Sequence, residues 1–262
     1  SPLFTVPNIQ FTPHLGASTE EAQTAVGVEI SHQIAAFLID GKIINSVNVP
    51  SVDPDKLLQL NPYMELATKL GKVLCQMVEG PLSSVEIGVF GEASKFDSHP
   101  IASASMVGLL CRHHAVPVNQ INALHLARRQ GINVTKVSSA DSKDYLSLVR
   151  ITAQSSEQTV ILEGAIFDES RPRLVKINGY EIESPLEGHL LITKHADEPG
   201  VVGKIGEALG KEDINISRMQ VGVAEDTQLA IAILDISGSL SSAALENVSK
   251  IGAVEKVLQV LL

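Results

Sequence analysis

The most constraining stretch of this sequence is an apolar run that meets a helical pattern through a short polar turn. Residues 189–193 read His-Leu-Leu-Ile-Thr, which is typical of a buried strand. Pro199 and Gly200 then turn the backbone, and we expect Asp197 to cap the helix that follows. Apolar residues recur at helical spacing, at Val201, Ile205, Ala208 and Leu209. The backbone N–H groups at such a helix start favour an anion such as a carboxylate.

The sequence after this turn continues as alternating strand and helix patterns. Strands are predicted at residues 214–221, 228–235 and 254–262, and a helix is predicted at 241–250. The order is strand, helix, strand, strand, helix, strand, which defines a ferredoxin-like βαββαβ unit. We place this unit at residues 187–262.

Composition limits the cellular setting. The chain has 262 residues, a net charge of −10 and only two cysteines, Cys75 and Cys111. The negative charge argues against nucleic acid and anionic membrane as partners. Two cysteines in apolar patterns favour reduced core thiols, and no apolar run reaches the roughly 20 residues of a membrane span. We expect a cytoplasmic protein without a metal site, because His113 and His114 lack a third ligand at useful spacing.

The N-terminal region shows a strand pattern, a polar octet and a helical pattern. Residues 4–11 alternate between apolar and polar side chains, which predicts a strand. The octet at 12–19 reads Thr-Pro-His-Leu-Gly-Ala-Ser-Thr, and its last hydroxyls can cap a helix. That helix is expected to stop at Gly41, and residues 43–50 are expected to run extended.

The middle region, residues 51–186, is predicted to form one α+β unit. Its helices are predicted at 54–77, 101–110 and 120–130. Its strands are predicted at 82–90, 132–138, 145–153, 157–166, 173–177 and 180–183. Asn178-Gly179 between the last two strands is a strong signal for a tight hairpin turn.

Three basic residues lie just before that hairpin. Arg171, Arg173 and Lys176 could together hold a phosphate, since charge-assisted hydrogen bonds favour such a ligand. The alternative is that they are solvated side chains on an edge strand.

Three sets of motifs carry a family resemblance. The C-terminal unit has D-x-P-G-V at its first turn and I-N-I at its second strand, and it resembles an ACT domain, a small module that senses amino acids. The middle unit has I-N-A-x-x-L-A-x-x-x-G-I-x-V and V-x-I-N-G-Y, which resemble an intervening domain. Residues 1–50, with T-P-H-L-G-A-S-T and G-K-I-I-N-S-V-N-V-P, are similar to the end of the catalytic part of the D-3-phosphoglycerate dehydrogenases. These belong to the NAD-dependent 2-hydroxyacid dehydrogenases.

The resemblance implies a multidomain fold of α/β and α+β class. The end of a Rossmann-type NAD-binding and catalytic domain would occupy residues 1–50. An α+β intervening domain would follow at 51–186, and a ferredoxin-like ACT domain at 187–262.

The same resemblance implies a catalytic role for the octet. His14 would be the acid/base that exchanges a proton with the substrate hydroxyl, a task suited to an imidazole near neutral pH. Gly16, Ala17 and Ser18 would lie near the nicotinamide of NAD. The reaction implied is oxidation of 3-phospho-D-glycerate to 3-phosphohydroxypyruvate in L-serine biosynthesis. The chain has no G-x-G-x-x-G for the pyrophosphate, and the family's substrate-binding Arg and orienting Glu are expected upstream of Ser1. We therefore expect the C-terminal part of a longer protein, inactive by itself.

The resemblance also implies an effector site, in which L-serine or a similar small amino acid binds between two subunits. His195, Asp197 and Asn215 take the ligand positions, and the N–H groups of Gly200 and Val201 would meet the carboxylate. We expect the three side chains to converge on one crevice at the helix start, with His195 donating to the ligand. The alternatives are a helix cap for Asp197 and a strand-edge amide for Asn215. Self-association through ACT sheet edges would make the protein a homo-oligomer.

Two other functions fit the sequence. One is a non-catalytic amino-acid-binding regulatory protein that has kept a relic of the dehydrogenase. The other is a different 2-hydroxyacid dehydrogenase with the same C-terminal domains.

Overall fold

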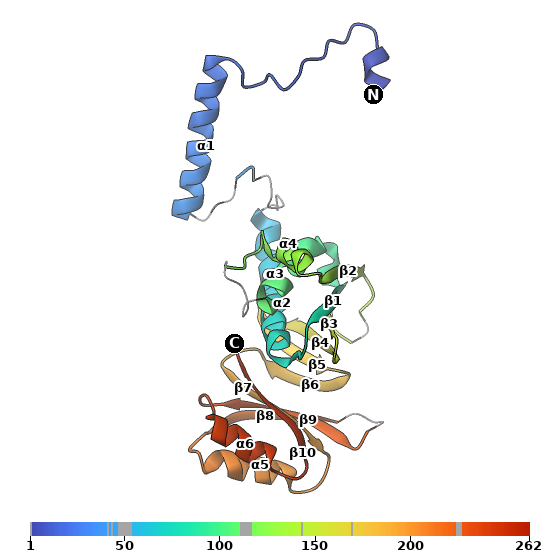
Figure 1. Cartoon of the computed structure of the whole chain (residues 1–262), viewed down its shortest axis with the longest axis vertical. Coiled ribbons are helices and arrows are strands. Elements are labelled where there is room, and N and C mark those ends of the chain that lie inside the picture. The colour runs from blue at the N-terminus through green and yellow to red at the C-terminus, as the bar shows by residue number, and fades with distance from the viewer. Residues whose placement is uncertain are drawn as a thin grey trace. The chain divides into compact units, whose positions relative to one another are not determined.

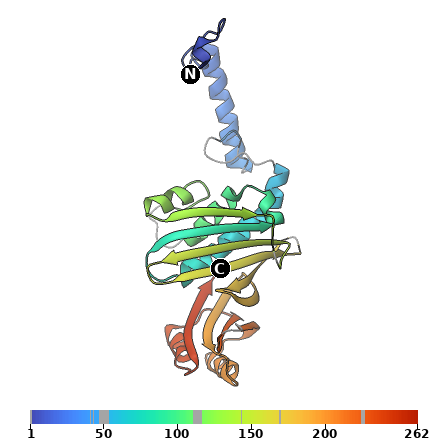
Figure 2. The same ribbon diagram turned by 90° about the vertical axis from the view of Figure 1, so that its right-hand side faces the viewer.

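The structure is a computed structural model that describes residues 2–40, 42, 44–46, 54–110, 117–142, 144–168, 170–223 and 227–262. The chain divides into two compact units, Ser1–Val52 and Asp53–Leu262. Figures 1 and 2 show their helices and strands in two views.

The first unit contains a short 3-10 helix, η1 (Pro2–Thr5), and one long helix, α1 (Glu20–Asp40). The predicted cap is confirmed, because the Thr19 hydroxyl oxygen accepts the Ala22 N–H at 3.2 Å. The strand expected at residues 4–11 is wrong. No residue from 4 to 40 is buried, and a lone strand without a neighbour leaves its backbone groups unpaired. Gly41 and most of 43–50 lie outside the described residues.

The N-terminal part of the second unit has the predicted helices and strands, with one short 3-10 helix added. They are α2 (Pro54–Met77), β1 (Leu82–Gly91), η2 (Glu92–Lys95), α3 (Ser98–Leu109), α4 (Ala123–Arg129), β2 (Asn133–Ser139), β3 (Ser147–Ser155), β4 (Thr159–Phe167), β5 (Arg171–Ile177) and β6 (Tyr180–Pro185). The strands form a six-stranded sheet in the order β2-β1-β3-β4-β5-β6. Only the β1–β2 pair among these is parallel.

Helices α2 and α3 cover one face of this sheet, and in Figure 2 they lie behind it. Their backbones approach closely where Gly71 meets Gly108. A Cβ on Gly71 would lie 2.2 Å from the Ser105 carbonyl oxygen, and a Cβ on Gly108 would lie 2.1 Å from that of Thr68. Only glycine permits this crossing, which brings the aliphatic side chains of both helices onto the sheet.

The Asn178-Gly179 turn is confirmed. Both residues have positive φ angles, 49° and 87°, as a two-residue type I′ hairpin turn requires. Asn178 also accepts the Ile161 N–H through its side-chain oxygen at 2.7 Å, which ties the turn to β4.

The C-terminal part has the predicted βαββαβ order. Its elements are β7 (His189–Ala196), α5 (Val201–Gly210), β8 (Ile216–Val223), β9 (Leu229–Ile236), α6 (Ser242–Ser249) and β10 (Val254–Leu261). The strands form a four-stranded sheet in the order β10-β7-β9-β8. Both helices pack on one face of this sheet over an aliphatic core that includes Leu191, Ile205 and Leu234.

The opposite face of the four-stranded sheet packs on the rest of the second unit. Ile192, Ile233 and Val260 share one buried cluster with side chains of α2 and the six-stranded sheet. The approach is closest at Gly222 of β8, where a Cβ would lie 2.2 Å from the Glu181 carbonyl oxygen. One face of the C-terminal sheet is therefore covered by helices and the other by its neighbour domain, which leaves its edges and its helices for other contacts.

Candidate functional site

His195 is the last helix-facing side chain of β7. It is 2% exposed, and its Nδ1 lies 2.8 Å from the carbonyl oxygen of Ala196. A carbonyl oxygen only accepts hydrogen bonds, so Nδ1 carries the proton in the neutral ring and Nε2 presents a lone pair. Within the described part of the chain, Nε2 is buried and has no hydrogen-bond partner. In this tautomer Nε2 is an acceptor, whereas the expectation from the sequence was that His195 donates to the ligand.

Thr193 adds a second unsatisfied polar group to the same face of β7. It lies two residues before His195, so both side chains point toward the helices. Its residue is 0% exposed, and its hydroxyl oxygen has no partner among the described residues. Sequence reasoning missed Thr193, although its two-residue spacing from His195 in a predicted strand was the available signal.

Asp197 does not cap α5, contrary to the sequence prediction. The N-cap residue is Gly200, which has a left-handed φ of 90° and makes no side-chain capping bond. The Val201 N–H instead points to the Glu198 carbonyl oxygen at 3.4 Å. The turn at Pro199 and Gly200 places the helix start beyond the reach of a cap from Asp197. The exposed Asp197 carboxylate is therefore not committed to the helix, and the Val201 N–H has a weak partner already.

Asn215 lies at the opposite end of the sheet from Asp197. The Asp197 N–H donates to the Gln228 carbonyl oxygen just before β9, whereas the Asn215 carbonyl oxygen accepts the Ser237 N–H just after it. Strand β9 has 8 residues, so the two positions are roughly 30 Å apart at about 3.3 Å per residue. The expected convergence of His195, Asp197 and Asn215 within one chain is wrong.

The two edges of the four-stranded sheet differ. At the β10 edge, the side-chain amide of Gln76 bonds both backbone groups of Leu261, at 3.0 Å from its N–H and 3.1 Å from its carbonyl oxygen. Gln76 thus takes the place of a neighbouring strand. At the β8 edge, Val221 and Val223 are 42% and 49% exposed. Strand β8 is the edge better suited to pair with another chain.

The octet residues lie in consecutive turns before α1. The Ser18 N–H donates to the Leu15 carbonyl oxygen at 3.0 Å, and the Gln23 amide donates to the Ala17 carbonyl oxygen at 2.8 Å. His14 is exposed, and a Cβ on Gly16 would meet nothing within 4 Å. The described residues therefore do not by themselves enclose a dinucleotide.

The basic cluster on β5 is paired with acidic side chains. Arg171 lies 3.6 Å from Asp168, and Arg173 lies 2.5 Å from Glu183. Lys176 lies 3.0 Å from Glu181 and 3.4 Å from Asp144. The hydrogen bond to Glu181 and then that to Asp144 raise the pKa of Lys176 against the opposing effect of burial. Four carboxylates face three cations, so an anion would have to displace a carboxylate first.

Two features are absent from the described residues. No three His, Cys, Asp or Glu side chains gather there as metal ligands. No helix in that part of the chain is both long and apolar enough to cross a bilayer.

Two known protein families match the second unit, one in each of its two parts. The family described as the D-3-phosphoglycerate dehydrogenase intervening domain matches residues 59–178, and the ACT domain family matches residues 189–253. These matches define the class of the protein, an intervening domain joined to an ACT domain. The chain belongs to the D-3-phosphoglycerate dehydrogenase family.

The similarity to curated relatives extends along almost the whole chain. The D-3-phosphoglycerate dehydrogenase of Methanocaldococcus jannaschii is 35% identical over 98% of this chain and 49% of the relative. The one of Synechocystis sp. is 32% identical over 97% of this chain and 46% of the relative. The one of Bacillus subtilis is 30% identical over 96% of this chain and 48% of the relative. The chain thus spans about half the length of the relatives it matches.

Proposed function

We propose that this chain acts as the C-terminal half of a D-3-phosphoglycerate dehydrogenase and binds a small amino acid, L-serine, between two copies of its ACT domain. The observation that carries this proposal is the buried, unpaired Nε2 of His195 beside a turn whose carboxylate, Asp197, is not used as a cap. An unsatisfied buried acceptor is costly, and a ligand that donates to it removes that cost.

Pairing of two copies through β8 supplies the missing side chain. Strands β7 and β8 both run antiparallel to β9, so the end of β7 and the end of β8 lie at the same end of the sheet. Two β8 edges that pair antiparallel around a two-fold axis bring the start of one β8 to the end of the other. Asn215 of one copy then reaches the end of the sheet that carries His195 and Asp197 of the other.

The polarity of each group favours an amino acid with a hydroxyl. Asp197 accepts from the ammonium, and the Asn215 amide can donate to the carboxylate. The neutral His195 ring offers an acceptor, which a serine hydroxyl satisfies and an alanine methyl does not. Serine should therefore bind more tightly than alanine, since a buried acceptor left unpaired costs about 1–3 kcal/mol.

Calorimetric titration of the 262-residue chain with L-serine, L-alanine and glycine tests this order. Sedimentation across the same concentrations should show that the serine-binding species is a dimer or larger. Equal affinity for serine and alanine would contradict the role of His195. Serine binding by a strict monomer would contradict the two-copy site.

For the complete enzyme we propose NAD-dependent oxidation of 3-phospho-D-glycerate to 3-phosphohydroxypyruvate, with His14 as the acid/base. The octet and the relatives support this assignment. A non-catalytic amino-acid sensor is the second candidate, favoured by the ACT domain match at residues 189–253. Assay of a chain extended by the upstream coding sequence separates the two, because only the enzyme reduces NAD.

A further inference from the structure

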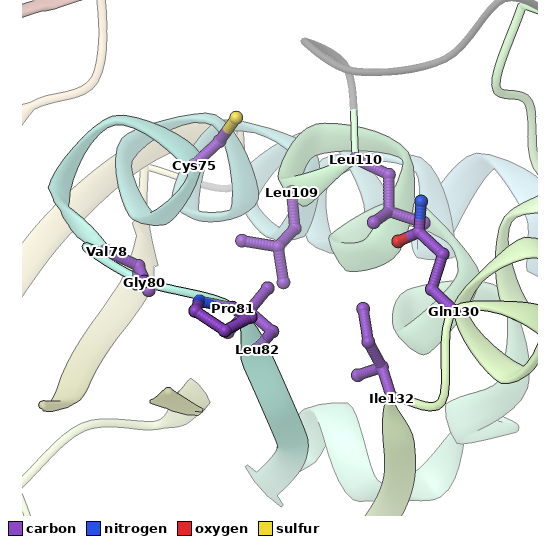
Figure 3. Close-up of a pocket in the computed structure, with 9 residues that line it drawn as sticks. All are labelled: Cys75, Val78, Gly80, Pro81, Leu82, Leu109, Leu110, Gln130 and Ile132. Atoms are coloured by element: carbon purple, nitrogen blue, oxygen red, sulfur yellow. The ribbon is translucent and has the colours of Figure 1, made fainter. Parts of the chain in front are cut away.

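A cavity of about 340 Å³ lies at one end of the intervening domain. The side chains of Leu109 at the end of α3 and of Leu110 just after it point into the cavity, as Figure 3 shows. Those of Leu82 on β1 and of Ile132 just before β2 also point into it. The cavity has room for on the order of ten waters, taking about 30 Å³ for each. Its size falls in the range of small-molecule pockets, which begins at about 300 Å³.

The described lining is uncharged. Aliphatic residues make up most of it, its polar side chains are Cys75 and Gln130, and no side chain of the described lining is charged. An ion brought into such a site loses its hydration without a compensating partner. This cavity therefore differs in chemistry from the charged cluster on β5, and it does not fit a phosphorylated substrate.

The C-terminal ends of three helices lie beside the cavity and give it a partial negative charge. Helices α2, α3 and α4 end at Met77, Leu109 and Arg129, each next to a residue that lines the cavity. The C-terminal end of a helix presents carbonyl oxygens and a partial negative charge. The carbonyl oxygens at the end of α4 already accept the N–H groups of residues 130–132, and that of Met77 accepts the Gln158 amide. A hydroxyl can still donate to the second lone pair of such an oxygen, whereas the partial negative charge of these ends repels a carboxylate.

The last turn of α2 and the residues just after it connect this cavity to the C-terminal strand. Cys75 and Val78 line the cavity, while Gln76 and Glu79 face β10. Gln76 bonds both backbone groups of Leu261, and Glu79 forms an ion pair with Lys256. A ligand that tightens this turn therefore acts on the contact that caps the edge of β10.

We propose that this cavity binds a small uncharged aliphatic molecule with a hydroxyl-type donor, and that its occupancy stabilises the Gln76 contact with β10. This site is separate from the amino-acid site and does not depend on that proposal. The ligand is defined by its chemistry, namely an apolar body, no charge and one donor.

A matched series of probes tests the first part of the proposal. 1-Hexanol, hexanoate and hexylammonium share one alkyl chain and differ in charge. At neutral pH, only 1-hexanol should bind the 262-residue chain saturably, read from its thermal midpoint and from the Ile132 methyl signal in NMR spectra. Binding by hexanoate with equal strength, or no saturable binding by 1-hexanol, would overturn the proposal.

A cavity-filling variant locates the probe. Val78→Phe puts a ring into the cavity and should weaken 1-hexanol binding by at least about tenfold, because a packed interior has no room for both. Val137→Phe is the matched control, since Val137 lies on β2, is 39% exposed and does not line the cavity. If Val78→Phe is folded by circular dichroism and binds 1-hexanol as the control does, the site is elsewhere and the proposal fails.

Hydrogen exchange tests the connection to β10. The Leu261 N–H donates to the Gln76 side chain, so its exchange should slow when 1-hexanol binds. In Gln76→Ala this slowing should disappear while 1-hexanol still binds, because Gln76 does not line the cavity. Binding without any change at the Leu261 amide would refute the proposed transmission.

Discussion

Complementation between two variants that bind serine weakly is the sharpest test of the effector site. Asp197 and Asn215 lie roughly 30 Å apart within one chain, at either end of β9, and a small amino acid cannot bridge that distance. Each bound effector must then take Asp197 from one copy and Asn215 from the other. Asp197→Ala and Asn215→Ala each remove one charge-assisted hydrogen bond, worth about 1.5–3 kcal/mol. Serine affinity should fall roughly tenfold to 150-fold in either variant alone.

A mixture of the two variants should regain part of the binding. Random pairing makes about half of the dimers heterodimers, and each heterodimer has one site with both wild-type side chains and one with neither. About a quarter of all sites should then bind serine with wild-type affinity. The assay is calorimetric titration after the variants are mixed at equal concentration and allowed to exchange subunits. Mass spectrometry of intact dimers confirms the exchange.

The outcome separates two geometries. A mixture that binds serine no better than the single variants, although heterodimers form, would refute the two-copy site. The single variants carry their own control for folding. Because Asp197 makes no cap to α5, Asp197→Ala should keep the thermal midpoint of the wild-type chain. A drop in that midpoint equivalent to about 1 kcal/mol in the free energy of unfolding would show that the carboxylate does cap the helix.

Three further outcomes are expected. Gly71→Ala should lower the free energy of unfolding by about 1–3 kcal/mol in urea titrations, because its Cβ would meet the Ser105 carbonyl oxygen. Gly206→Ala has open space around its Cβ and should raise the free energy of unfolding by up to about 1 kcal/mol. Equal effects of the two substitutions would contradict the packing of Gly71. Inorganic phosphate should bind the β5 cluster weakly, and Glu183→Gln should strengthen that binding by freeing Arg173; an unchanged affinity in chemical-shift titrations would exclude a phosphate site there. The 262-residue chain should not reduce NAD with 3-phosphoglycerate, and His14→Ala in a complete enzyme should lower kcat roughly 10²–10⁴-fold; activity near wild type would remove its acid/base role.

The sequence predicted most elements of the second unit because their signals are local. Hydrophobic periodicity distinguishes α2 from β1 within a few residues, and Asn178-Gly179 specifies its turn through the φ angles that both residues tolerate. The order βαββαβ followed from the same periodicity. The strand expected at residues 4–11 failed because a strand depends on a neighbour, which no local pattern supplies.

The arrangement of the candidate site was decided by tertiary structure. The sequence identified His195, Asp197 and Asn215, but strand order and direction put Asn215 at the far end of β9, and a left-handed Gly200 moved the helix start away from Asp197. The carboxylates that neutralise Arg173 and Lys176 come from strand β6 and from the loop before β3. Contacts between residues distant in the chain depend on register and packing, whereas a sequence pattern reports only the surroundings of a few consecutive residues.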